Sequence, residues 1–270
     1  MPTVADIREK AGEAPITMLT AYDATTAGIV ESVGTDIILV GDSMGNATLG
    51  YDTTLPVTVD EMASHTGAVA RGTDEALVVA DMPFLSVGTD RQTSMENAGR
   101  MLKEADADAV KLESGPHTVE LTKDLVDLGI PVMAHLGLTP QRVNQLGGYS
   151  RQGTTEEAAD RIVELAVAHE EAGAFSLVLE HVPANLAAAI TDELAIPTIG
   201  IGAGPNCDGQ VLVFHDAVGL SSRTPPFSRE FGDVRGEMTE ALEAYIEAVE
   251  EGEFPAAEHS HVEDSLEDLY

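Results

Sequence analysis

The chain has 270 residues, 43% of them hydrophobic, which is enough to bury one large core. Acidic residues far outnumber basic ones: Asp and Glu total 47, Lys and Arg total 14, and the formal net charge is -33 at pH 7. This sign argues against nucleic acid and anionic membranes as partners, because both would repel the protein.

The size of the negative charge points to a salt-rich environment. Like charges repel one another in dilute buffer, but the Debye length falls to about 3 Å in 1 M salt. Lysine is also rare and occurs only at positions 10, 103, 111 and 123. We therefore expect adaptation to concentrated salt, as in the cytoplasm of a halophile, and an ordinary acidic enzyme is the alternative.

The cysteine content and the lack of long apolar runs limit the compartment. Cys207 is the only cysteine, which excludes an intramolecular disulfide and a cysteine-built zinc site. Residues 1–10 carry no apolar signal core, and no apolar run approaches the length of a membrane span. These features predict a cytoplasmic protein that has no membrane partner.

Eight short apolar runs recur along the chain. Each is continuous rather than alternating, and most are rich in Val and Ile, which is typical of strands buried on both faces of a parallel sheet. The runs cover residues 16–20, 36–40, 76–80, 109–112, 130–134, 175–179, 196–199 and 211–214.

Helix signals separate most of these runs. Thr58 with Glu61, and Thr89 with Gln92, have the spacing of capping boxes. Longer helices are predicted over residues 154–173 and 233–251. Alternating strands and helices predict an α/β fold in which eight units close into a (β/α)8 TIM barrel, and a doubly wound open sheet is the alternative.

The chain is expected to form one domain. No linker or internal repeat divides residues 1–255, which we assign to the barrel. Residues 256–270 are small, polar and acidic, and we expect this C-terminal tail to be mobile or to pack on a neighbouring subunit.

Polar side chains end seven of the eight runs. Barrel enzymes build their sites at the C-terminal ends of the strands, so these side chains should converge on one mouth. A solvated rim explains any single case, but seven similar cases favour a common site. The residues are Tyr22 and Asp23, Asp42 and Ser43, Asp81, Lys111 and Glu113, His135, Glu180 and His181, and His215 and Asp216.

Three carboxylates are expected on consecutive strands. Asp42, Asp81 and Glu113 end neighbouring runs, and parallel strands lie about 4.8 Å apart. Two carboxylates 4 Å apart repel by roughly 4 kcal/mol at an effective dielectric near 20, so three together need a cation or a captured proton. Lys111 compensates only in part. Oxygen ligands without sulfur, with room for waters and a chelating substrate, favour Mg²⁺ over Ca²⁺.

A candidate general base ends the sixth run. Glu180 follows an apolar stretch, where burial should raise the pKa of its carboxyl, and the alternative is a rim glutamate paired with a cation. His135 either donates to a substrate oxygen or satisfies buried backbone. His181 is expected to point away and to be structural.

Several motifs closely resemble the 3-methyl-2-oxobutanoate hydroxymethyltransferase family, also called ketopantoate hydroxymethyltransferase. They include TAYD (20–23), GDSMG (41–45), ADMPF (80–84), KLE (111–113), HLGLTPQ (135–141), LE (179–180) and IGIGAG (199–204). The match continues in order to about residue 251. The resemblance implies a barrel of the phosphoenolpyruvate mutase/isocitrate lyase type.

The resemblance also implies roles for individual residues. Mg²⁺ would be held by Asp42, Asp81 and Glu113, and Glu180 would be the catalytic base. Substrate contacts carry over to Asp42, Ser43, Asp81 and Lys111, to which His135 is added as a candidate.

The implied reaction transfers a hydroxymethyl group from 5,10-methylenetetrahydrofolate to 3-methyl-2-oxobutanoate through a Mg²⁺-stabilised enolate. The product is 2-dehydropantoate (ketopantoate), in the first step of pantothenate and coenzyme A biosynthesis. The family forms decamers or related rings, which implies a homo-oligomer. A pterin other than folate remains open as the one-carbon carrier.

Two other functions remain possible at this point. A lyase or mutase of the same superfamily would share the metal site, but its typical cysteine-containing loop (KKCGH-like) is absent. A non-catalytic barrel that binds 2-oxo acids would bind without turnover. The sequence also departs from the family near its end, because residues 222–226 lack the usual lysine near Phe227 and residues 262–270 extend past the usual finish.

Overall fold

The computed structural model describes residues 2–263. They form two units, one of residues 2–214 and 225–228 and the other of residues 215–224 and 229–263. The division into a barrel domain of residues 1–255 and a tail of residues 256–270 stays a prediction, and residues 264–270 of that tail lie outside the described part.

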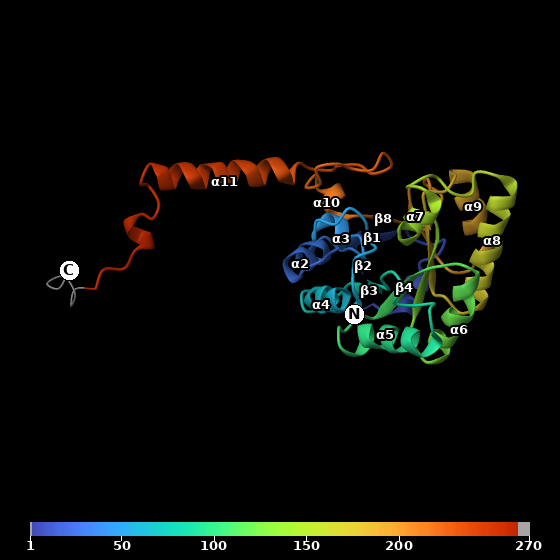
Figure 1. Ribbon diagram of the computed structural model, residues 1–270. Helices are drawn as coiled ribbons and strands as arrows, with labels where there is room; N and C mark the ends of the chain where they lie inside the picture. Colours follow the sequence, from blue (N-terminus) through green and yellow to red (C-terminus); the bar gives the residue numbers. More distant parts are fainter. Residues whose placement is uncertain (1, 264–270) are drawn as a thin grey trace. The chain divides into compact units, whose positions relative to one another are not determined.

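Eight parallel strands close in chain order into a barrel (Figure 1). β8 pairs with β1, with Ile16 opposite Gly209, so the sheet has no free edge between its first and last strands. The closed barrel is confirmed, and the open-sheet alternative is wrong. The strands are β1 (Ile16–Thr20), β2 (Ile37–Val40), β3 (Leu77–Asp81), β4 (Ala109–Glu113), β5 (Val132–Gly137), β6 (Ser176–Glu180), β7 (Thr198–Ile201) and β8 (Gly209–Leu212).

Helices follow all the strands except β7, which connects directly to β8, and they surround the barrel in the first unit (Figure 1). These elements are α1 (Val4–Glu9), α2 (Ala24–Ser32), α3 (Met44–Ala47), α4 (Val59–Ala70), α5 (Arg91–Lys103), η1 (Pro116–Thr118), α6 (Val119–Asp127), η2 (Pro140–Arg142), α7 (Val143–Leu146), α8 (Glu156–Glu171) and α9 (Ala184–Glu193). α10 (Phe214–Ala217) begins at the end of the first unit, and α11 (Val234–Glu250) and η3 (Ala257–His259) belong to the second.

All eight predicted strands are present, although β5, β7 and β8 each begin two positions away from the predicted start. β5 extends to Gly137, so His135 lies within the strand. β8 begins at Gly209, because its register is set by pairing with Ile16, and it ends before Phe214, whose N–H donates to Thr20 Oγ1 at 2.9 Å. His215 therefore lies in α10 and does not end a strand.

The capping predictions had mixed outcomes. The Thr58–Glu61 box is confirmed, since the Thr58 hydroxyl accepts from the Glu61 N–H and the Glu61 carboxylate accepts from the Thr58 N–H. The box expected at Thr89 is wrong. Asp90 caps α5 instead, because its two carboxylate oxygens accept from the N–H groups of both Gln92 and Thr93.

The continuous apolar runs of β2 to β7 exist because these strands are buried on both faces, whereas β1 and β8 each expose one residue. Alternate side chains such as Met18, Leu39 and Val79 fill the barrel interior. Their neighbours, such as Val40 and Val78, pack outward against the helices. Each such side chain contributes roughly 1.5–3 kcal/mol on full burial, and the filled interior gives the barrel mouth a rigid floor.

Candidate active site

The polar residues at the barrel mouth continue the inward-facing series of the strands. Side chains two apart in a strand share a face, so the residue two positions after an interior side chain also points inward. This relation joins Val79 to Asp81 on β3, Ala109 to Lys111 and Glu113 on β4, Met133 to His135 on β5, and Val178 to Glu180 on β6.

A buried ion pair lies at the centre of the mouth. Lys111 Nζ is 2.5 Å from Asp81 Oδ1, and both side chains are only 6% exposed. The Asp42 N–H donates to the other oxygen of Asp81 at 3.2 Å. Burial alone would lower the pKa of Lys111, but the charges of Asp81 and Asp42 outweigh it and raise that pKa. The ammonium group therefore stays charged.

Negative charge exceeds positive charge around this pair. Burial, followed by the charge of Asp81, raises the pKa of Asp42 to about 7. Burial, followed by the charge of Asp42, raises the pKa of Glu113 well above its usual value. Three carboxylates thus share one ammonium group, and an added cation would favour their charged forms.

The donor set suits a hard divalent cation. Over residues 2–263, no three or more His, Cys, Asp or Glu side chains lie close enough together to hold a metal ion by themselves. Mg²⁺ is commonly held by one or two carboxylates and keeps several waters, so it does not require such a group of side chains. Buried oxygen ligands with uncompensated charge therefore fit Mg²⁺.

His135 connects the ion pair to Glu180. Its Nδ1 lies 3.3 Å from Lys111 Nζ, and its Nε2 lies 3.1 Å from Glu180 Oε2 without the alignment of a hydrogen bond. Burial and the Lys111 charge lower the pKa of His135 well below its usual value, so the ring is neutral. An ammonium group can only donate, so Nδ1 accepts and Nε2 carries the proton that faces Glu180.

Glu180 ends β6 at the barrel mouth, and its carboxyl has the properties of a general base. Its side chain is 15% exposed, and burial raises the pKa of its carboxyl to about 7. The charge of Lys111 opposes this shift but does not cancel it. A carboxyl with such a pKa can both accept and release a proton near neutral pH.

Two glycines allow the backbone to form this mouth. Gly137 has φ of 97°, and a Cβ there would lie 2.2 Å from the carbonyl oxygen of Glu180. A Cβ at Gly41 would lie 2.6 Å from Ser43 Oγ, which instead contacts the Tyr22 hydroxyl at 2.9 Å. These glycines let β5 approach β6 and let Ser43 fold back beside Asp42.

The structure brings together all the predicted site residues, Asp42, Ser43, Asp81, Lys111, Glu113, His135 and Glu180, whose individual roles stay predictions. Three other polar residues that were expected at strand ends serve local structure. Asp23 caps α2 by accepting from the Thr26 N–H at 2.8 Å. The His181 ring packs on Phe227 with centroids 5.1 Å apart, and Asp216 accepts from Ser221 in the second unit.

Sequence reasoning missed one member of the site. Gln141 donates from Nε2 to Asp42 Oδ2 at 2.8 Å, although 99 positions separate the two residues. Gln141 closes the HLGLTPQ motif, and Pro140 before it opens a 3₁₀ turn after β5. In the sequence, only its place shortly after the end of β5 indicated that Gln141 belongs to the site.

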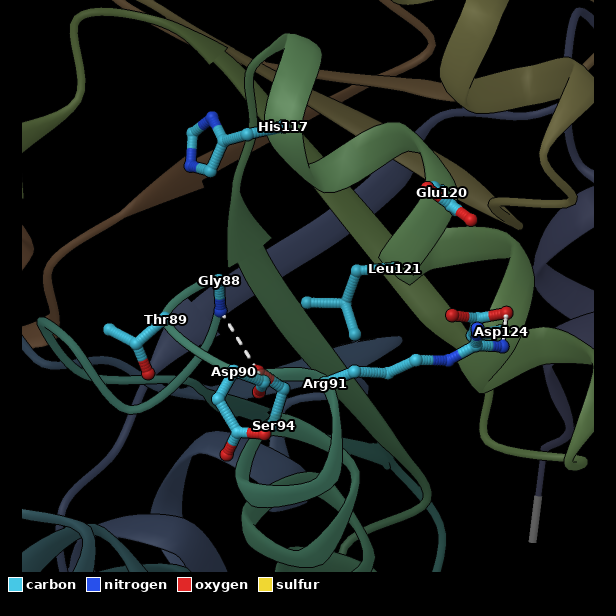
Figure 2. A pocket seen from close by; sticks show the side chains of 9 residues that line it. All are labelled: Gly88, Thr89, Asp90, Arg91, Ser94, His117, Glu120, Leu121 and Asp124. Carbon is cyan, nitrogen blue, oxygen red and sulfur yellow. Dashed lines mark hydrogen bonds and ion pairs between the residues drawn. The ribbon is translucent and has the colours of Figure 1, made fainter.

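A separate pocket lies beside the loops that follow β3 and β4 (Figure 2). It is lined by residues from the start of α5 and from η1 and α6, including an Arg91–Asp124 ion pair. The Gly88 N–H donates to Ser94 Oγ, and both residues line the pocket. None of the predicted site residues lines this pocket.

The sequence matches the ketopantoate hydroxymethyltransferase family over residues 2–257. The chain belongs to this family. It is 73% identical over 265 residues to 3-methyl-2-oxobutanoate hydroxymethyltransferase of Natronomonas pharaonis, with 98% of each chain covered. It is 68% identical over 270 residues to the enzyme of the same name from Haloarcula marismortui, with each chain fully covered.

The family and these relatives show that the chain is a hydroxymethyltransferase. The two alternative functions, a lyase or mutase and a non-catalytic barrel, are therefore excluded. These relatives come from halophilic archaea, which agrees with the salt adaptation expected from the net charge. Of the helices in residues 2–263, none combines the length and apolar composition that crossing a bilayer requires.

Solved structures share the barrel fold of this chain. A 2,3-dimethylmalate lyase, described as a PEP mutase/isocitrate lyase superfamily member, has a TM-score of 0.58 at 16% identity and covers 98% of this chain and 94% of its own. A phosphonopyruvate hydrolase in complex with oxalate and Mg²⁺ has a TM-score of 0.62 at 12% identity, with 96% and 93% covered. At such identities the likeness concerns the fold.

Proposed function

We propose that this enzyme transfers the hydroxymethyl group from 5,10-methylenetetrahydrofolate to 3-methyl-2-oxobutanoate and so forms 2-dehydropantoate. The observation that carries the proposal is the buried Glu180 carboxyl, with a pKa of about 7, joined through His135 to the Asp81–Lys111 pair. This arrangement places a base beside a charged anchor. The product would begin pantothenate and coenzyme A biosynthesis in the cytoplasm.

The charged half of the mouth would bind and orient the oxo acid. Lys111 supplies an ammonium group that attracts the substrate carboxylate, and the Ser43 hydroxyl beside Asp42 can donate to a substrate oxygen. His135 Nε2–H, which has no aligned hydrogen-bond acceptor, can donate to another. These contacts would fix the C3 hydrogen toward Glu180.

Asp42, Asp81 and Glu113 are the residues that would hold Mg²⁺. The bound ion would act as a Lewis acid that stabilises negative charge on the keto oxygen of the substrate. The oxalate and Mg²⁺ complex of the phosphonopyruvate hydrolase supports this proposal through a protein of the same fold. Asp81 also keeps Lys111 in place, so one carboxylate serves both the cation site and the substrate anchor.

Glu180 would then remove the C3 proton. The proton passes to Oε1 or Oε2, and the C–H electron pair becomes the enolate. One water hydrolyses the methylene bridge of the donor, which breaks both of its C–N bonds, releases tetrahydrofolate and leaves the carbon as formaldehyde. The C3 carbon attacks that carbon, and the resulting alkoxide takes up a proton to give the hydroxymethyl group. A positioned base contributes typically 10²–10⁴ in rate, about 3–5 kcal/mol.

We also propose that the enzyme is a homo-oligomer, with a decamer as the expected form. α11 supports this proposal because no residue along it is buried. An apolar stripe on this helix is at least 45% exposed and has the spacing of one helix face. It consists of Met238, Leu242, Tyr245, Ile246 and Val249.

A turnover assay in molar KCl tests the proposed function. Protein, Mg²⁺, 3-methyl-2-oxobutanoate and 5,10-methylenetetrahydrofolate should yield 2-dehydropantoate, identified by mass spectrometry. Turnover only when a different reduced pterin replaces folate would overturn the donor and keep the reaction. Absence of product with every donor would contradict the proposed substrate pair.

A further inference from the structure

We infer that Gln141 is a positioning residue that aligns the three proposed Mg²⁺ ligands. The inference rests on the proposed metal site and concerns a residue outside it. Gln141 comes from the turn after β5, whereas the three carboxylates end β2, β3 and β4 or follow them directly. One residue therefore reaches three other segments of the mouth.

The side-chain amide of Gln141 uses both of its N–H groups. Nε2 donates to Asp42 Oδ2 at 2.8 Å and to the carbonyl oxygen of Met82 at 3.0 Å. Met82 directly follows Asp81, so the second bond fixes the backbone next to that carboxylate. The amide thus bridges the ends of β2 and β3.

The backbone of Gln141 reaches the third carboxylate. Its N–H faces both oxygens of Glu113, at 3.0 Å and 3.2 Å. Pro140 opens the turn that aims this N–H at Glu113. A substitution at position 141 keeps this backbone bond and removes only the two side-chain bonds.

The side-chain contacts of Gln141 leave one oxygen of Asp42 available to a cation. Gln141 holds Oδ2 of Asp42, so that oxygen and the plane of the carboxylate are fixed while Oδ1 receives no bond from Gln141. The amide carries no charge and so does not compete with a cation by electrostatic attraction. Residues that orient a ligating carboxylate typically affect metal affinity 10–100-fold when removed.

The test is Mg²⁺ binding measured by calorimetry without substrate, in molar KCl. Gln141→Ala should weaken binding by about 10–100-fold. Gln141→Met, which keeps most of the volume but cannot donate, should weaken binding to a similar extent and guards against a packing defect. Gln92→Ala is the matched control, because the Gln92 amide donates to Glu96 on the exposed side of α5.

A second readout separates positioning from general destabilisation. For Gln141→Met, deuterium exchange at C3 of 3-methyl-2-oxobutanoate should return to within a few-fold of wild type at saturating Mg²⁺, with the Mg²⁺ requirement shifted 10–100-fold upward. An unchanged Mg²⁺ dissociation constant in folded Gln141→Met overturns the inference alone. A wild-type protein that binds no Mg²⁺ overturns the metal proposal and this inference together.

Discussion

The two halves of the barrel mouth hold buried ionisable groups in opposite ways. At the ends of β3 and β4, Asp81 and Lys111 form a direct ion pair at 2.5 Å. At the ends of β5 and β6, His135 is neutral and Glu180 has a pKa of about 7, and their closest atoms are 3.1 Å apart without hydrogen-bond alignment. In the first half the Lys111 ammonium group stays charged, which suits binding of an anion, and in the second half Glu180 can change protonation near neutral pH, which suits proton transfer.

The largest effect should come from removing the base in the second half. Glu180→Gln keeps the size of the side chain but cannot accept a proton, so C3 deuterium exchange in D2O should fall about 10²–10⁴-fold. Substrate affinity should change little. Proton NMR of 3-methyl-2-oxobutanoate with Mg²⁺ and no donor measures the exchange. Exchange at the wild-type rate would show that another residue is the base, and His135 would be tested next.

Removing a charge from the first half should instead damage binding and stability together. Asp81→Ala leaves the Lys111 ammonium buried without its closest partner, a change that typically costs about 3–5 kcal/mol. Mg²⁺ and oxo-acid binding should weaken as well. Denaturant melts and calorimetry measure the two effects. Asp127→Ala, which breaks an ion pair with Lys123 in which both side chains are 62% exposed, should cost less than about 1 kcal/mol and serves as the control.

Unchanged oxo-acid affinity in folded Asp81→Ala, with or without a chelator, would remove Asp81 from the proposed binding site. A loss of stability alone would leave the ion pair as a structural feature.

The strands could be predicted from sequence because burial on both faces leaves a continuous apolar run. Lys111 and Glu113 were placed on one side by their spacing alone, and the structure has both facing inward. The eighth strand was shifted because its register depends on pairing with Ile16, which a local pattern does not contain. His215 was misplaced with it.

Gln141 could not be assigned for a related reason. Its bonds to Asp42 and Met82 span 99 and 59 positions, and a 3₁₀ turn aims the amide. Glutamine is also uncharged, so its presence in a sequence does not indicate a metal site. Long-range polar contacts of this kind become visible only after the strand order is known.

The pH dependence of exchange should report the second half of the mouth. Glu180 must be ionised to act, and burial raises its pKa to about 7. The exchange rate should therefore fall about tenfold per pH unit below 7 and level off above it. Saturating Mg²⁺ at every pH keeps metal binding from limiting the rate. A profile that is flat down to pH 5 would contradict the role of burial at Glu180.

Salt concentration should have the smallest effect on the exchange rate at the site, although it should change the melting temperature of the whole protein. With a net charge of -33, exposed carboxylates repel one another, so the melting temperature should fall as KCl drops from molar to tens of millimolar. The Asp81–Lys111 pair is only 6% exposed and is poorly screened, so exchange per folded molecule should change less than about twofold. Melts and exchange rates are measured on the same samples, above and below the unfolding salt concentration. A constant melting temperature would contradict the salt adaptation, whereas exchange that falls steeply in still-folded protein would mean that the mouth itself depends on screening.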